Sequence, residues 1–119
     1  MELTRTPTEA RPGRMQPLAR LPVFLSLEGK RALLAGGSQA AAWKAELLSA
    51  SGAQVEVYAQ EVCDELRELV DDPPHGEIVL RGRAWTSGDF GGAAVAVGAF
   101  EDDDGAAAFA AAARAAGVP

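Results

Sequence analysis

The sequence predicts the α/β fold class, with a Rossmann-like parallel sheet and flanking helices. Short apolar runs that suit buried strands alternate with longer segments of helical pattern, which is typical of parallel α/β proteins. A glycine turn, Gly36-Gly37-Ser38, lies where the first strand passes into the first helix. The chain has 119 residues, of which 48% are hydrophobic, so it fits one domain with its own core.

The first half of the pattern is a strand, a helix and a second strand. Residues 31–35 form an apolar run closed by glycines, as expected of a buried parallel strand. Residues 39–51 predict a helix, and residues 54–58 predict the second strand. The residues expected on the inward stripe of this first helix are Ala40, Trp43, Leu47 and Leu48.

The second half adds two helices and two strands. Residues 62–70 predict the second helix, and the alanine-rich residues 104–116 predict the last one, because alanine is the best helix former. The predicted strands are residues 77–81, with 84–85 as an extension, and residues 93–98, with a loop at 88–92. The inward residues of the second helix are expected to be Val62, Leu66, Leu69 and Val70.

The first 20 residues differ from the rest of the chain. They hold three prolines and four arginines without a helical or strand period, so we predict a flexible tail at 1–20 and the Rossmann-like NAD-binding domain at 21–119. Met15 lies just before the regular pattern begins, and the sequence leaves open whether translation starts at Met1 or at Met15.

Composition excludes several classes of partner. The formal net charge of -6 argues against nucleic acid or an anionic membrane as a partner. No apolar run approaches the roughly 20 residues that span a bilayer, and no secretory signal is present. A single cysteine, Cys63, cannot form an internal disulfide, which fits a reducing compartment. We therefore expect a cytoplasmic protein.

The glycine turn predicts a dinucleotide site. Gly36 permits the tight turn, a small residue at Ser38 lets a pyrophosphate approach the backbone, and Ala41 lets the helix pack close to the strand. The start of the helix, at Gln39, then offers unpaired N–H groups to phosphates. Ser38 replaces the second glycine of the usual pattern, so the alternative is that Gly36 and Gly37 form only a tight strand-to-helix turn.

The second expected feature of such a site is an acid that binds the ribose near the end of the second strand. Glu61 stands slightly late for this role, after Gln60, and Glu56 falls in mid-strand. The alternative for Glu61 is a carboxylate in the first turn of the next helix, where the helix dipole favours it. The sequence leaves these two interpretations open.

Other polar residues have simpler interpretations. The run from Glu101 to Asp104 precedes a helix, where capping is favoured over metal binding, and no Cys/His cluster has zinc spacing, so no metal is expected. His75 is expected on the surface without a partner, and Cys63 as an inert thiol. Two tryptophans, Trp43 and Trp85, are expected in the core or at an interface.

At this point the chain resembles a known family. Leu21-Pro22-Val23-Phe24, Leu27-Glu28-Gly29-Lys30, the glycine turn with Lys44-Ala45-Glu46-Leu47-Leu48, and Gly88-Asp89-Phe90-Gly91-Gly92-Ala93 are similar, in order and spacing, to the precorrin-2 dehydrogenase and sirohydrochlorin ferrochelatase domain of siroheme synthase. The resemblance runs from about Leu21 to the end and implies NAD-dependent oxidation of precorrin-2 to sirohydrochlorin. Some members of the family also insert iron.

The resemblance also implies roles for residues. Gln39 and Ala40 would meet the pyrophosphate, and Gln60 and Glu61 would lie near the adenosine ribose. No arginine cluster follows Tyr58, which favours NAD over its phosphate. The implied partner is the tetrapyrrole substrate precorrin-2, and a homodimer is left open.

The chain departs from this family at three places. Ser38 replaces a glycine, and Phe100 stands where the family has a threonine. The family's catalytic aspartate follows a fifth strand that would lie beyond Pro119, as would its dimerisation segment, so the catalytic residue is unknown. The chain is then either a fragment of a dehydrogenase or a short paralogue. The alternatives are a degenerate, non-catalytic module that binds a nucleotide or tetrapyrrole, or a structural domain fused to another tetrapyrrole enzyme.

Overall fold

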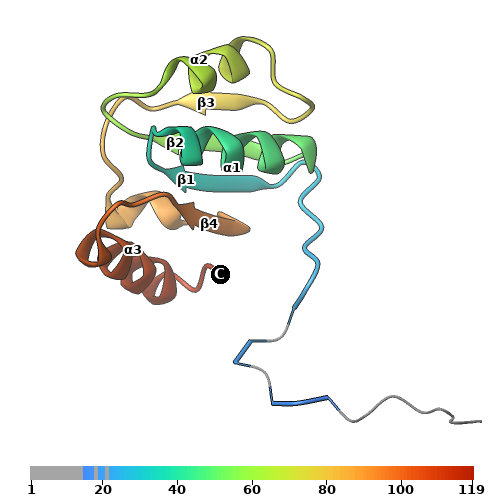
Figure 1. Cartoon of the computed structure of the whole chain (residues 1–119), viewed down its shortest axis with the longest axis vertical. Coiled ribbons are helices and arrows are strands. Elements are labelled where there is room, and N and C mark those ends of the chain that lie inside the picture. Colours follow the sequence, from blue (N-terminus) through green and yellow to red (C-terminus); the bar gives the residue numbers. More distant parts are fainter. Residues whose placement is uncertain (1–14, 18, 21) are drawn as a thin grey trace, which may run out of the picture.

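The computed structural model describes residues 15–17, 19–20 and 22–119, and in it a parallel sheet lies between two layers of helices (Figure 1). The sheet has four strands in the order β3-β2-β1-β4. All three strand pairs are parallel. This arrangement confirms the predicted fold class. The strands are β1 (Arg31–Ala35), β2 (Gln54–Tyr58), β3 (Ile78–Leu80) and β4 (Val95–Gly98).

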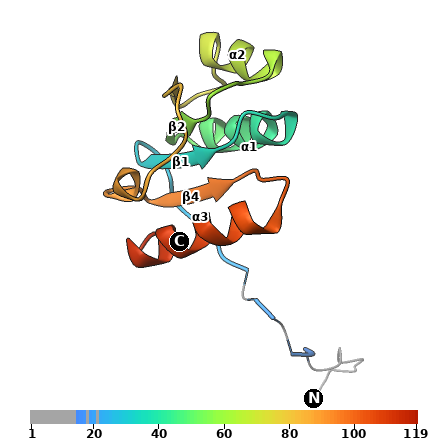
Figure 2. The ribbon, with the colours of Figure 1, turned by 90° about the vertical axis from the view of Figure 1, so that its left-hand side faces the viewer.

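Helices cover both faces of the sheet (Figure 2). Two of them, α1 (Gln39–Ala50) and α2 (Asp64–Asp71), lie side by side on one face. The short 3-10 helix η1 (Ser87–Phe90) and α3 (Asp103–Ala115) lie on the other. Because strand residues alternate between the two faces, Leu34 of β1 packs in the core under α1 and Leu33 in the core under α3.

The inward face of α1 is not the predicted one. Trp43 is 63% exposed and Leu47 is 55% exposed, and Ala40 is exposed as well, so only Leu48 of the expected stripe is buried. The helix packs against the sheet through small side chains, which bring it too close to the strands for an indole ring. The buried residues of α1 are Ala41, Ala42, Ala45, Leu48 and Ser49.

Helix α2 begins two residues later than predicted. The backbone N–H of Cys63 donates to the carbonyl oxygen of Gly37 at 2.7 Å, and Cys63 has extended backbone angles. This bond holds the preceding loop against the glycine turn, so the helix starts at Asp64. The predicted inward residues are nonetheless correct, because Leu66 is buried and the other three pack against the same core.

The region from β3 to β4 differs from the prediction, because the strand is shorter and the connection contains a short helix. Strand β3 ends at Leu80, and Gly82 turns the chain with a φ of 67°. Residues 84–85 therefore do not extend the strand. The predicted loop contains η1, which is capped because Thr86 and Asp89 satisfy each other's backbone N–H groups.

The core under α3 is rich in aromatic rings. Phe90 of η1 lies 5.2 Å from Phe109 of α3, between ring centroids. Trp85 meets Phe90 edge to face at 5.6 Å and Phe109 at 5.4 Å, which agrees with its predicted place in a core. Phe100 is 5.3 Å from Phe109. These contacts fix η1 and α3 on the sheet.

The segment before β1 has no regular structure from residue 22 to 27. Its side chains at Val23, Phe24 and Leu25 are exposed, whereas Leu27 is buried in the first core. No helix in the described part of the chain is long and apolar enough to cross a membrane.

Candidate cofactor site

The strand order places a crevice at the carboxyl edge of the sheet. From β1 the chain crosses to β2 and then to β3 on one side, and β4 pairs with the other side of β1. The order therefore reverses between β1 and β4, and open α/β sheets bind ligands at such a reversal. The glycine turn that joins β1 to α1 lies at this place.

Both positions of the turn require glycine, because other backbone segments of the chain pass too close to leave room for a Cβ. Gly36 has a φ of 129° and donates its N–H to the carbonyl oxygen of Tyr58, and a Cβ there would lie 2.8 Å from the carbonyl oxygen of Ala99. A Cβ on Gly37 would overlap the carbonyl oxygen of Glu61. The turn therefore threads between the ends of β2 and β4.

Ser38 is accommodated as a helix cap. Its backbone is extended, with φ -79° and ψ 179°, so a side chain causes no strain. Its hydroxyl oxygen accepts from the N–H of Ala41 at 3.3 Å. In the described part of the chain, the N–H groups of Gln39 and Ala40 have no protein acceptor and open toward the crevice. They are the donors that an anionic group could use.

The crevice has a volume of about 520 Å³, within the range of small-molecule sites. Its floor includes Gly98, against which the ring of Phe100 packs so closely that no Cβ would fit. Lys44, which sequence reasoning left out of the site, reaches into it from α1. The lining residues are Ser38, Gln39, Ala40, Lys44, Gly98, Ala99, Phe100, Glu101 and Ala106.

Gln60 and Glu61 lie in the loop after β2, beside the glycine turn, and both are exposed. Since α2 begins at Asp64, Glu61 is not in its first turn, which holds Asp64 and Glu65 instead. The alternative role of Glu61 as a first-turn carboxylate is therefore wrong. Its backbone passes beside Gly37 after the end of β2, and its role in binding a ribose stays a prediction.

A second hollow, of about 590 Å³, runs between α1 and α2. The exposed Trp43 lines it, together with Gln39, whose amide donates to Glu65 at 3.1 Å. This groove carries four carboxylates and no cation, so it repels the phosphates of a dinucleotide. The acidic lining residues are Glu46, Glu65, Glu68 and Asp72. We therefore place the cofactor site in the crevice, not in the groove.

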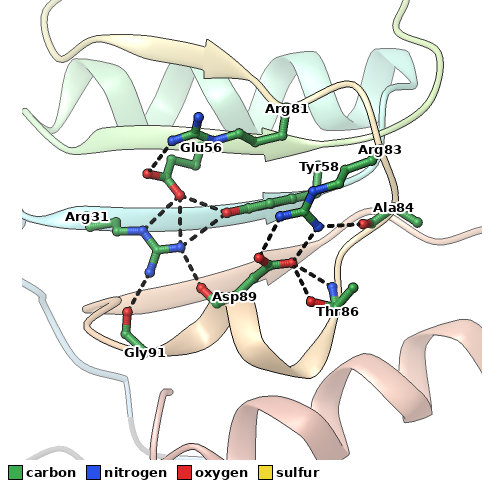
Figure 3. Close-up of polar contacts among 9 residues, drawn as sticks. All are labelled: Arg31, Glu56, Tyr58, Arg81, Arg83, Ala84, Thr86, Asp89 and Gly91. Atoms are coloured by element: carbon green, nitrogen blue, oxygen red, sulfur yellow. Dashed lines mark hydrogen bonds and ion pairs between the residues drawn. The ribbon is translucent and has the colours of Figure 1, made fainter.

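A polar cluster on the α3 side of the sheet surrounds Glu56 (Figure 3). Its carboxylate accepts from Arg31 at 2.9 Å, from the Tyr58 hydroxyl at 2.9 Å and from Arg81 at 3.1 Å. The hydrogen bond from Arg31 is the main reason that the pKa of Glu56 falls from 4.5 to about 2. Arg31 also donates to the carbonyl oxygen of Gly91 at 2.9 Å, which ties β1 to the end of η1.

The cluster continues to the β3–β4 connection. Arg83 forms a two-pronged ion pair with Asp89, with distances of 2.8 and 2.9 Å, and lies 5.0 Å above the ring of Tyr58. The guanidinium of Arg83 lowers the pKa of Asp89 well below its usual range. The structure thus brings Arg81 and Arg83 to Tyr58, where the sequence showed no nearby arginines. Because each guanidinium already meets a carboxylate, we assign the cluster a structural role.

Two simpler predictions can be compared with the structure. Asp102 caps α3, because its carboxylate accepts from the N–H of Gly105 at 2.6 Å, as the capping interpretation required. His75 is on the surface as predicted, but it has a partner, since its Nε2 lies 3.1 Å from Glu28 Oε2. Within residues 15–17, 19–20 and 22–119, no three Cys, His, Asp or Glu side chains are grouped to hold a metal ion.

A glycine turn at the reversal point of a parallel sheet, followed by a helix with free N–H groups, is typical of dinucleotide-binding Rossmann-like domains. The chain belongs to the family described as "Putative NAD(P)-binding", which matches residues 23–119. This membership supports NAD as the cofactor, as the sequence predicted.

Two siroheme synthases have sequences similar to this chain. Siroheme synthase of Pseudomonas paraeruginosa is 39% identical over 99 residues, which are 83% of this chain and 21% of that protein. Siroheme synthase 1 of Halorhodospira halophila is 40% identical over 82 residues, 69% of this chain and 17% of that protein. These relatives confirm the resemblance found in the sequence, and the chain spans about a fifth of their length.

A solved structure shares the fold. It is named SirC, precorrin-2 dehydrogenase, and matches with a TM-score of 0.65 at 23% identity, over 77% of this chain and 45% of that one.

Proposed function

We propose that this chain is the NAD-binding part of a precorrin-2 dehydrogenase in siroheme synthesis. The observation that carries the proposal is the crevice at the reversal point, where free N–H groups follow the glycine turn. The siroheme synthase relatives and the fold of a precorrin-2 dehydrogenase support the choice of substrate.

Each part of the site has a role in this proposal. The N–H groups of Gln39 and Ala40 bind the pyrophosphate, and Gly36 and Gly37 hold the turn that presents them. Ser38 fixes the first turn of α1 by capping it. Gln60 and Glu61 bind the adenosine ribose at the end of β2.

NAD, when bound, accepts the hydride that precorrin-2 loses, and the chain holds the nicotinamide against the substrate. Oxidation also removes a proton, and the acceptor is not assigned to any residue of this chain. The family's aspartate would follow Pro119. We therefore expect the 119 residues alone to bind NAD and to oxidise precorrin-2 weakly or not at all.

Calorimetric titration with NAD, followed by an assay of precorrin-2 oxidation, tests the proposal. We expect binding in the micromolar range and negligible turnover. Absence of binding at millimolar NAD would contradict the cofactor site. Rapid turnover by the isolated chain would contradict the assignment of the proton acceptor to a residue outside it.

One observation favours a second candidate, a module that binds a nucleotide or tetrapyrrole without turnover. Phe100 lines the crevice where the family has a threonine, and it narrows the space above Gly98. Replacing Phe100 with threonine distinguishes the two candidates. If the variant binds NAD much more tightly than the natural chain, the crevice is a degenerate cofactor site.

A further inference from the structure

Lys44 is the one cationic side chain among the described residues that line the crevice. It lies in the second turn of α1, with its side chain partly buried. Its ammonium group donates to the carbonyl oxygen of Gly98, at the end of β4, with a distance of 2.8 Å. No pattern in the sequence predicted this lysine at the ligand site.

The direction of the side chain explains how it reaches the crevice. In a helix, side chains lean toward the N-terminus, so Lys44 is carried back toward the first turn of α1. The same first turn presents the free N–H groups of Gln39 and Ala40. The residues that carry the ammonium group and these N–H groups therefore line the same crevice. The ammonium group lies beside the end of β4, where it is bonded to Gly98.

The present partner of Lys44 is a weak one. A carbonyl oxygen is neutral, and no carboxylate of residues 15–17, 19–20 or 22–119 forms an ion pair with this ammonium group. The ammonium group already makes this bond charge-assisted, and an anionic acceptor would add the Coulomb attraction between opposite charges. An anionic oxygen in the crevice would thus be a better partner than Gly98.

We infer that Lys44 binds an anionic oxygen of the ligand that occupies the crevice. The inference rests on the proposed function. The oxygen could belong to a phosphate of NAD or to a carboxylate of the tetrapyrrole, and both present the same chemistry to an ammonium group. Lys44 is then a binding residue, since it lies on α1, the helix whose first turn also presents the N–H groups proposed to bind the pyrophosphate.

The test uses the whole 119-residue chain and two substitutions at this position, Lys44→Gln and Lys44→Arg. Lys30→Gln is the matched control, because Lys30 is the other lysine of the chain, is exposed and lies in the turn before β1. Each protein is titrated with NAD and with ADP-ribose by calorimetry, and with sirohydrochlorin by absorbance. Far-ultraviolet circular dichroism checks that each variant is folded.

We expect Lys44→Gln to lower the affinity for one of the ligands by about tenfold or more, which is the effect of losing a hydrogen bond between charged groups. We expect Lys44→Arg to retain most of the affinity and Lys30→Gln to change nothing. If the affinities for NAD and ADP-ribose both fall, Lys44 binds a phosphate. If only the affinity for sirohydrochlorin falls, Lys44 binds a carboxylate of the tetrapyrrole.

Two results overturn the inference in different ways. If the natural chain binds a ligand and folded Lys44→Gln binds it equally well, Lys44 has no such role and the proposed function stands. If the natural chain binds neither NAD nor sirohydrochlorin, the proposed function fails and the role of Lys44 fails with it.

Discussion

Replacing Glu56 with glutamine should destabilise the fold by an amount that depends on pH. The carboxylate is 19% exposed and accepts hydrogen bonds from Arg31, Tyr58 and Arg81. Glutamine keeps the shape but loses the charge, and its amide N–H group would face the donors of the surrounding arginines. Arg31 would then be left partly buried without its counter-charge.

The magnitude follows from the pKa of Glu56, which falls from 4.5 to about 2 on folding. A lowered carboxyl pKa stabilises the folded state above the unfolded value, and this contribution is lost as pH falls through the folded value. The shift corresponds to about 3 kcal/mol at neutral pH, as an order of magnitude. Less than about half of this contribution to the free energy of unfolding remains at about pH 3.

Urea unfolding of the natural chain and of Glu56→Gln, measured from about pH 7 down to about pH 3, tests this reasoning. The control is Glu77→Gln, because Glu77 is exposed just before β3 and forms no ion pair with another described residue. We expect a difference of about 2–3 kcal/mol for Glu56→Gln at neutral pH that shrinks on acidification. A difference that stays constant with pH, or equals that of Glu77→Gln, would refute the account.

Three further changes test the packing. Gly37→Ala should cost about 2–4 kcal/mol in urea unfolding, because its Cβ overlaps the backbone of the loop before α2; equal stability with Gly91→Ala, whose Cβ would meet open space, would contradict this. Leu48→Ala should cost about 2–4 kcal/mol and Leu47→Ala less than about 1 kcal/mol, and the reverse order would contradict the observed inward face of α1. Asp102→Ala should lower stability by about 1 kcal/mol in thermal unfolding, and no change would mean that the cap is not formed in solution.

Local pattern was enough to predict the central strands. Residues 31–35 and 54–58 were predicted to the residue. The first is a mostly apolar run, the second alternates polar and apolar residues, and both are bounded by turn residues. The phase of α1 could not be predicted in this way. Its alanines point in every direction, so the expected stripe followed its large apolar residues, which are Trp43, Leu47 and Leu48, and only Leu48 of these is buried. In the fold, α1 packs against the sheet mainly through small side chains, and Leu48 is the one large side chain among its buried residues.

The polar cluster depends on contacts that no local pattern contains. Arg31 and Glu56 are 25 residues apart, and the parallel register of β1 and β2 brings them onto one face. The alternation Val-Glu-Val in β2 does indicate that this face is not wholly apolar. A second partner, Arg81, follows β3 on the other side of β2, and that neighbour too is set by the assembled sheet.

The glycine turn has a more limited meaning than its sequence suggested. Gly36 is needed because its backbone has a positive φ beside Ala99, and Gly37 because the loop before α2 touches it. Both constraints come from the chain itself, so the glycines would be required even if no cofactor were bound. What the fold leaves over for a ligand is different: the free N–H groups of the first turn of α1 and the ammonium group of Lys44. Variants at the glycines therefore report on folding, whereas variants that alter a donor to the ligand, such as Lys44→Gln, report on binding.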